Sequence, residues 1–232
     1  MIPLRVDARG TRVVVFTWLY GLACIAALIR LVTVPAPVAT DLMYRLAVVP
    51  ARLWSQGLLS EEALTLFTST LLHAGWIHLV GNMLFLAVFG PSVESRLGWP
   101  LTALLLAGAG CAGALAFAWM NPLSTVPLVG ASGAIAGLLG AQLIMAPRAR
   151  VTTFVPAFIS IEIASLPAVF VVGLWFATQV VSQVASVSSV TGRVDVAWVS
   201  HIAGFIVGLT MALAWRLATR SRAGRSTRRT KR

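Results

Sequence analysis

The sequence Gly130-Ala131-Ser132-Gly133-Ala134-Ile135-Ala136-Gly137-Leu138-Leu139-Gly140 decides the fold of this chain. The stretch is apolar enough to lie in a lipid bilayer, and small residues recur along it at helical spacing. Such a stripe allows a second helix to approach backbone to backbone. A lone serine in such a helix most often serves packing, with its hydroxyl bonded to a carbonyl one turn earlier. A catalytic role for Ser132 therefore requires a partner elsewhere in the chain.

The composition of the whole chain indicates a membrane protein. Of its 232 residues, 58% are hydrophobic and 11% are charged, whereas a soluble domain carries about a quarter charged residues. The net charge of +11 could suggest a nucleic-acid-binding protein, but eight of the eighteen basic residues lie in the tail from Arg216 to Arg232. A basic tail at this place is explained by membrane topology and by anionic lipid headgroups. We expect a lipid bilayer as the environment and no nucleic acid as a partner.

Six apolar runs predict six transmembrane helices. They cover residues 13–29, 77–93, 99–120, 129–146, 166–187 and 196–217. The first run is longer than the apolar region of a signal peptide, so we expect it to remain uncleaved. We expect short interfacial helices between Leu42 and Leu59, and a loop over residues 147–165.

The predicted fold class is thus an all-α membrane protein, built as a bundle of six transmembrane helices. A basic N-terminus (residues 1–12) precedes the membrane domain (13–217), and a basic, disordered tail (218–232) follows it. With both termini in the cytoplasm, the inner segments hold 14 Lys and Arg residues and the outer segments hold 4. This distribution satisfies the positive-inside rule, and an even number of spans returns the chain to the side where it began.

A histidine near the start of the sixth run supplies a partner for Ser132. His201 is followed by Gly204 and Gly208 on the same helical face, so the face that presents the imidazole also admits a close neighbour. The glycines expected to support packing beside Ser132 are Gly130, Gly133 and Gly137. Ser132 and His201 lie at similar predicted depths below the outer surface, which suits a nucleophile and its general base. The simpler alternative is a hydrogen-bonded histidine that only packs in the bundle.

His78 and Asn82 lie four residues apart in the second run, hence on one helical face. Both side chains can donate a hydrogen bond to the oxygen on which negative charge develops during acyl transfer. The alternative is a polar clamp between two helices. The acidic residue closest to His201 in the sequence, Asp195, is six residues earlier in a loop. We therefore expect a catalytic dyad rather than a triad.

We expect neither a metal nor another cofactor. The sequence has no HExxH motif, which disfavours a membrane zinc protease. Cys24 and Cys111 both fall within apolar runs, where they behave as small buried hydrophobic residues.

Three motifs, in this order, resemble those of the rhomboid intramembrane serine proteases. The motifs are His73-Ala74-Gly75-Trp76-Ile77-His78-Leu79-Val80-Gly81-Asn82-Met83, Gly130-Ala131-Ser132-Gly133 and His201-Ile202-Ala203-Gly204-Phe205-Ile206-Val207-Gly208. The segment from Phe89 to Gly98 also resembles the family's turn after the second span, and the resemblance covers residues 66–213. Two features depart from the family. Ser200 stands where alanine is usual, and a Trp-Arg pair of the first outer loop is missing, its nearest match being Arg52-Leu53-Trp54.

The resemblance implies a six-helix core with a water-filled cavity open to the outside. It implies that Ser132 is the nucleophile and that His201 is the general base and acid. It also implies an oxyanion site formed by His78, Asn82 and the backbone N–H of Ser132. The fifth helix would border the route by which the substrate enters, and it contains Pro167, Trp175, Phe176 and Gln179.

The resemblance therefore predicts a serine endopeptidase in a bacterial plasma membrane that cleaves membrane-protein substrates in or near their transmembrane segments. One alternative is a catalytically silent rhomboid-like protein that binds or escorts membrane clients, and the presence of both Ser132 and His201 argues against it. Another alternative is a small transporter with His201 as a proton relay. That reading would require inverted repeats, which the spacing of glycines and polar residues does not show.

Overall fold

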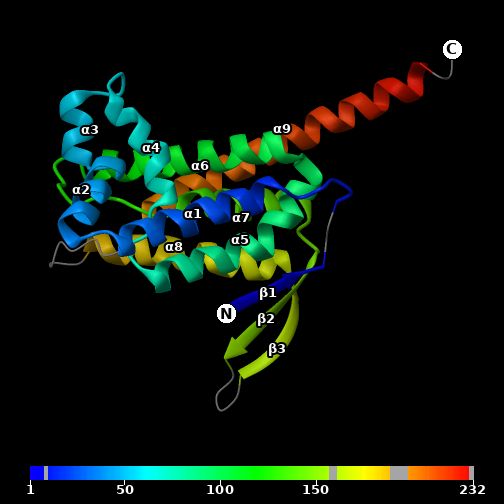
Figure 1. Cartoon of the computed structure of the whole chain (residues 1–232). Coiled ribbons are helices and arrows are strands. Elements are labelled where there is room, and N and C mark those ends of the chain that lie inside the picture. Colours follow the sequence, from blue (N-terminus) through cyan, green and yellow to red (C-terminus); the bar gives the residue numbers. More distant parts are fainter. Residues whose placement is uncertain (8–9, 157–160, 189–197, 230–232) are drawn as a thin grey trace.

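The computed structural model describes residues 1–7, 10–156, 161–188 and 198–229, whose long helices pack into one bundle (Figure 1). Short helices gather at one end of the bundle, and a small sheet lies beside it. The elements in chain order are β1 (Ile2–Val6), α1 (Phe16–Thr33), α2 (Ala36–Leu46), α3 (Pro50–Gln56), η1 (Glu61–Leu64), α4 (Thr65–Thr68), η2 (Ser69–Leu71), α5 (Trp76–Leu97), α6 (Trp99–Met120), α7 (Ser132–Met145), β2 (Arg150–Pro156), β3 (Ile161–Pro167), α8 (Ala168–Ser188) and α9 (Trp198–Arg229).

Four helices of the described residues are long and apolar enough to cross a membrane: α1, α5, α6 and α9, the last over Trp198–Arg220. The chain is therefore an integral, multi-pass membrane protein. Helix α7 has 14 residues, and the apolar part of α8, Ala168–Val184, is also short for a span. The helical membrane fold is thus supported, and the count of six spans stays a prediction.

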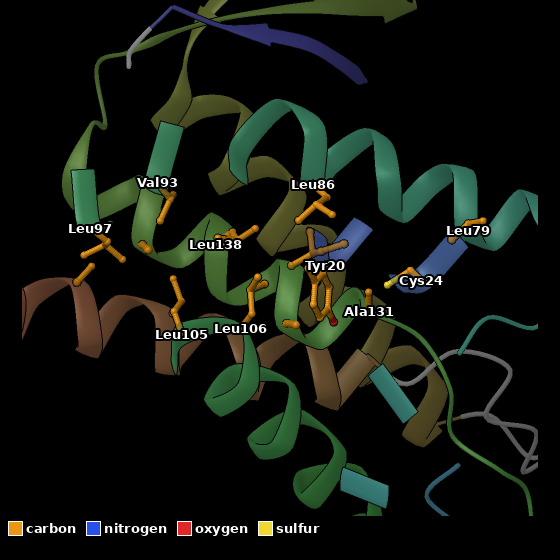
Figure 2. Close-up of a cluster of buried hydrophobic side chains, with 14 of the residues drawn as sticks. Tyr20, Cys24, Leu79, Leu86, Val93, Leu97, Leu105, Leu106, Ala131 and Leu138 are labelled. Carbon is orange, nitrogen blue, oxygen red and sulfur yellow. The ribbon is translucent and has the colours of Figure 1, made fainter. Parts of the chain in front are cut away.

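Helix α7 lies in the interior of the bundle because it is apolar or small on all sides. Every residue from Gly133 to Gln142 is buried, and the helix packs against α5, α6 and α9. Figure 2 shows the hydrophobic cluster in which side chains from several of these helices meet. The labelled members of this cluster are Tyr20, Cys24, Leu79, Leu86, Val93, Leu97, Leu105, Leu106, Ala131 and Leu138.

Glycines allow α7 and α9 to touch through their backbones. A Cβ atom added to Gly204 would overlap the carbonyl oxygen of Gly133, and one added to Gly208 would overlap that of Gly137. These four residues therefore lie in the contact where packing glycines were expected. Gly130 lies outside this glycine contact, and its role in packing stays a prediction. It precedes α7 with a φ of 132°, and a Cβ there would lie 2.8 Å from the His78 ring rather than against another helix backbone.

The buried carboxylate of Glu94 in α5 holds the start of α1. It accepts hydrogen bonds from the backbone N–H groups of Val15, Phe16 and Thr17 at 2.7–2.8 Å, and from Thr17 Oγ1 at 2.6 Å. Amide groups at a helix N-terminus have no acceptor within their own helix, and the helix dipole favours a negative charge there. Glu94 lies in the segment predicted as a turn, but α5 continues through it to Leu97.

The prediction of a loop over residues 147–165 is wrong. Strand β2 pairs antiparallel with β3 along its whole length and, on its other edge, with β1. The β-branched residues Val151, Thr152 and Thr153 favour an extended strand. Strand β1, which completes the sheet, comes from the N-terminal segment of the chain. Helical periodicity gives no signal for a strand there. The membrane bundle is therefore all-helical, as predicted. The three-stranded sheet is an additional element that was not predicted.

A disordered tail was expected from residue 218, whereas α9 continues to Arg229 in the structure; the division of the chain into an N-terminus, a membrane domain and a tail stays a prediction. Figure 1 shows this part of α9 extending beyond the other helices. Arg and Ala have high helix propensities, and extending an existing helix avoids the cost of nucleation. Residues 230–232 lie outside the described residues.

Short helices are present between Leu42 and Leu59, namely α3 and the end of α2, which begins earlier at Ala36, while their interfacial placement stays a prediction. This segment packs against α6, since Trp54 Nε1 donates a hydrogen bond to the carbonyl oxygen of Ala118 at 2.8 Å. A single bridge between Val48 and Leu128 also joins it to the loop that leads into α7. The segment thus supports the chain just before Ser132.

Candidate active site

Ser132 and His201 lie together where α7 and α9 begin. Ser132 is the first residue of α7, and His201 is in the first turn of α9. His201 Nε2 lies 2.7 Å from Ser132 Oγ, a normal hydrogen-bonding distance. The glycine contacts between the two helices begin one residue beyond Ser132, so helix packing positions the pair.

Two tryptophan rings enclose the His201 imidazole. The ring centroid of Trp175 lies 6.0 Å from that of His201, and the centroid of Trp198 lies 5.9 Å from it. Only 9% of His201 is exposed. The ring is therefore restricted in its motion, and Nε2 stays beside Ser132.

Sequence reasoning named Gln179 only as part of the helix beside the substrate route and missed its contact with His201. Gln179 of α8 places its Oε1 2.6 Å from His201 Nδ1, on the opposite side of the ring from Ser132. Asp195, the acidic residue closest to His201 in the sequence, lies outside the described residues. The feature of the sequence that could have revealed Gln179 is its carboxamide within an apolar helix. Polar groups at membrane depth are costly, so those that occur there usually have a function.

His78 and Asn82 of α5 line the same cavity as Ser132. Asn82 Nδ2 lies 3.0 Å from His73 Nε2, and His73 Nδ1 lies 3.3 Å from the carbonyl oxygen of Leu71. His73 precedes α5, and burial, with His78 as a lesser cause, lowers its pKa to about 4. Its neutral ring therefore donates to Leu71 and accepts from Asn82. An amide nitrogen carries two hydrogens, so Asn82 keeps one N–H for another acceptor.

The backbone N–H of Ser132 is a further donor. It belongs to the first turn of α7, whose N–H groups have no acceptor within the helix. The positive end of the helix dipole also favours negative charge at this place. The preceding turn is held by Gly130, whose N–H donates to the carbonyl oxygen of Ser69 at 3.0 Å.

A cavity of about 650 Å³ connects these groups. Its polar lining includes Ser132, His201, His78, Asn82 and Gln179, and its aromatic lining includes Phe85, Phe117, Trp175 and Trp198. Apolar walls with a few convergent polar groups are the usual form of a ligand-binding pocket. A hydroxyl, an imidazole and several N–H donors in one pocket are suited to acyl transfer.

The described residues offer no evident metal site, because no three His, Cys, Asp or Glu side chains among them come together. Cys24 and Cys111 are both free thiols.

Known proteins with similar sequences carry rhomboid names. The family model described as the Rhomboid domain matches residues 60–217. "Putative rhomboid protease YdcA" of Bacillus subtilis is 40% identical over 92 residues, which are 40% of this chain and 46% of that protein. "RHOMBOID-like protein 6, mitochondrial" and "RHOMBOID-like protein 1", both of Arabidopsis thaliana, are 38% identical over 90 residues and 41% identical over 83.

The two plant matches cover 39% and 36% of this chain, and 29% and 21% of the plant proteins. The chain thus spans less than half the length of each of these three curated relatives. The family model, in contrast, matches more than half of this chain. The chain belongs to the rhomboid family.

Proposed function

We propose that this protein is a serine endopeptidase that cleaves membrane-protein substrates in or near their transmembrane segments. The observation that carries the proposal is the 2.7 Å distance between Ser132 Oγ and His201 Nε2. The two atoms lie at a cavity that also reaches His78 and Asn82. Membership of the rhomboid family supports the same reaction.

In the proposed reaction, Ser132 Oγ attacks the carbonyl carbon of the scissile peptide bond while His201 Nε2 takes the hydroxyl proton. The carbonyl oxygen becomes negative in the tetrahedral intermediate. The donors proposed to stabilise it are the backbone N–H of Ser132, the His78 ring and the second N–H of the Asn82 amide. His201 then gives the proton to the leaving amine. Water enters the cavity and hydrolyses the acyl-enzyme, with His201 again acting as the base.

The proposal includes six spans, with both termini in the cytoplasm of a bacterial cell. The excess of Lys and Arg in the segments assigned to the inner side supports this topology. On this topology α7 and α9 both begin near the outer surface, so water reaches Ser132 and His201 from that side. The short α7 would then cross as an interior helix surrounded by longer neighbours.

Incubation of the purified protein with a panel of single-span reporter substrates tests the proposal. We expect the wild-type protein to cleave at least one reporter and Ser132→Ala to cleave none, because that change removes only the nucleophilic hydroxyl. The matched control is Ser55→Ala, since Ser55 is exposed and its hydroxyl donates a hydrogen bond to the Arg52 carbonyl within α3. This control should cleave at the wild-type rate.

A catalytically silent rhomboid-like protein would give a different result. It would bind reporters in pull-down experiments, but the wild-type protein and Ser132→Ala would both leave them intact. Cleavage by Ser132→Ala at the wild-type rate would also contradict the proposal, because another group would then have to be the nucleophile.

A further inference from the structure

The carboxamide of Gln179 has one orientation that satisfies its neighbours. Its Nε2 lies 3.2 Å from the carbonyl oxygen of Trp175 and 3.0 Å from Thr178 Oγ1. Thr178 Oγ1 donates its own hydrogen to the Trp175 carbonyl at 2.6 Å, so it accepts from Gln179. A flipped amide would set its oxygen against the Trp175 carbonyl, where neither atom can donate. The amide therefore presents its oxygen to His201.

An oxygen acceptor beside Nδ1 selects one tautomer of the imidazole. Because Gln179 Oε1 only accepts, the hydrogen of the neutral ring lies on Nδ1, and Nε2 carries the lone pair. Nε2 is the atom that lies 2.7 Å from Ser132 Oγ. The other tautomer would place the hydrogen on Nε2 and leave no base beside the serine hydroxyl.

We propose that Gln179 is a positioning residue for proton transfer from Ser132 to His201, an inference that rests on the proposed function. Soluble serine proteases place a carboxylate beside the same nitrogen. A neutral amide supplies the acceptor without adding a buried charge in the membrane. The proton moves from Ser132 Oγ to His201 Nε2, while the Nδ1–H bond to Gln179 is kept in both states of the ring.

Burial makes this contact difficult to replace. Gln179 is 5% exposed and His201 is 9% exposed, so water has little access to the space between them. A variant without an acceptor at residue 179 should therefore lose the preference for one tautomer and part of the stabilisation of the imidazolium.

Two substitutions at this position separate positioning from packing. Gln179→Leu removes the acceptor, and we expect kcat to fall about 10- to 150-fold, the usual effect of losing a hydrogen bond to a charged group. KM should change less than about twofold, because the contact matters after substrate binding. Gln179→Glu keeps an oxygen beside Nδ1, and in its protonated form its second oxygen can still donate to the Trp175 carbonyl, so kcat should recover to within about tenfold of the wild-type value.

Gln142→Leu is the matched control for the loss of a buried glutamine. Gln142 is fully buried in α7 and bonds Ser92 Oγ at 2.8 Å, away from the cavity lining. This control should lower the melting temperature while kcat per folded molecule is unchanged. If Gln179→Leu behaves in the same way, Gln179 only packs and the inference is overturned.

The ¹⁵N NMR spectrum of histidine-labelled protein tests the tautomer without any substrate. The chain has three histidines, so the His201 signals can be assigned from their loss in His201→Ala. We expect the Nδ1–H tautomer in the wild-type protein and a mixture of both tautomers in Gln179→Leu. An unchanged Nδ1–H signal in Gln179→Leu would overturn the role of Gln179. Failure of the wild-type protein to cleave any reporter would instead refute the proposed function, so the two results are distinguishable.

Discussion

Gly204 of α9 lies directly against the carbonyl oxygen of Gly133 in α7, with no room for a Cβ atom between them. Gly133 follows Ser132 in the sequence, and Gly204 is one turn beyond His201. The contact that closes the centre of the bundle is therefore also the contact that brings the hydroxyl to the imidazole. Changes in helix packing should alter stability and catalysis together.

The first prediction concerns this contact. Gly204→Ala would force the two backbones apart, and we expect a loss of about 1–3 kcal/mol in the free energy of unfolding. Cleavage should slow by up to about 100-fold, because a small displacement of reacting groups is costly. Denaturant unfolding in detergent and reporter cleavage give the two values.

Gly173→Ala in α8 is the control for that change, since an added Cβ there would have no neighbour within 4 Å. It should keep activity and leave stability equal or up to about 1 kcal/mol higher, as Ala is a better helix former than Gly. Equal tolerance of both substitutions would show that the α7–α9 contact is not tight.

The second prediction concerns Glu94. Glu94→Ala would leave four donors at the start of α1 without their acceptor, and the two on Thr17 are buried. We expect the free energy of unfolding to fall by at least about 3 kcal/mol. Glu61→Ala, at an exposed position, should change it by less than about 0.5 kcal/mol. Similar melting temperatures for these two variants would rule out an anchoring role for Glu94.

The third prediction concerns the proposed oxyanion donors. Asn82→Ala should lower kcat by at most about 10²–10³-fold with little change in KM, because His78 and the Ser132 N–H remain. The double variant with His78→Ala should lose less than the sum of the single effects, if both serve one oxygen. If both single variants have normal turnover per folded molecule and a lower melting temperature, then His78 and Asn82 serve as an interhelical clamp and not as oxyanion donors.

The fourth prediction concerns topology. Tags on both termini should be protected from protease added to intact cells, because an even number of spans leaves both ends in the cytoplasm. Protease protection followed by immunoblotting measures this. An accessible C-terminal tag would indicate an odd number of spans, and Ser132 and His201 would no longer begin their helices on the same side.

Features with a local sequence signal could be predicted. The glycines of α7 and α9 recur at helical spacing, and Ser132 and His201 are polar residues within apolar runs, so their proximity followed from the shared small-residue faces. The structure brings the two side chains to hydrogen-bonding distance.

Features that depend on distant parts of the chain could not be predicted. Strands β2 and β3 pair locally, but the third strand of the sheet, residues 2–6, comes from about 150 positions away. Gln179 is 22 positions from His201 on a different helix, and an amide is less expected than a carboxylate beside a catalytic histidine. The bond from Asn82 to His73 reaches out of α5 into the preceding turn.

Labelling with a fluorophosphonate probe tests most directly whether His201 activates Ser132. The probe reacts with an activated serine and requires no knowledge of the natural substrate. We expect peptide mass spectrometry to find the label on Ser132 in the wild-type protein, and we expect labelling to be lost in both Ser132→Ala and His201→Ala. Labelling of a different serine, or undiminished labelling of Ser132 in His201→Ala, would contradict the proposed catalytic pair.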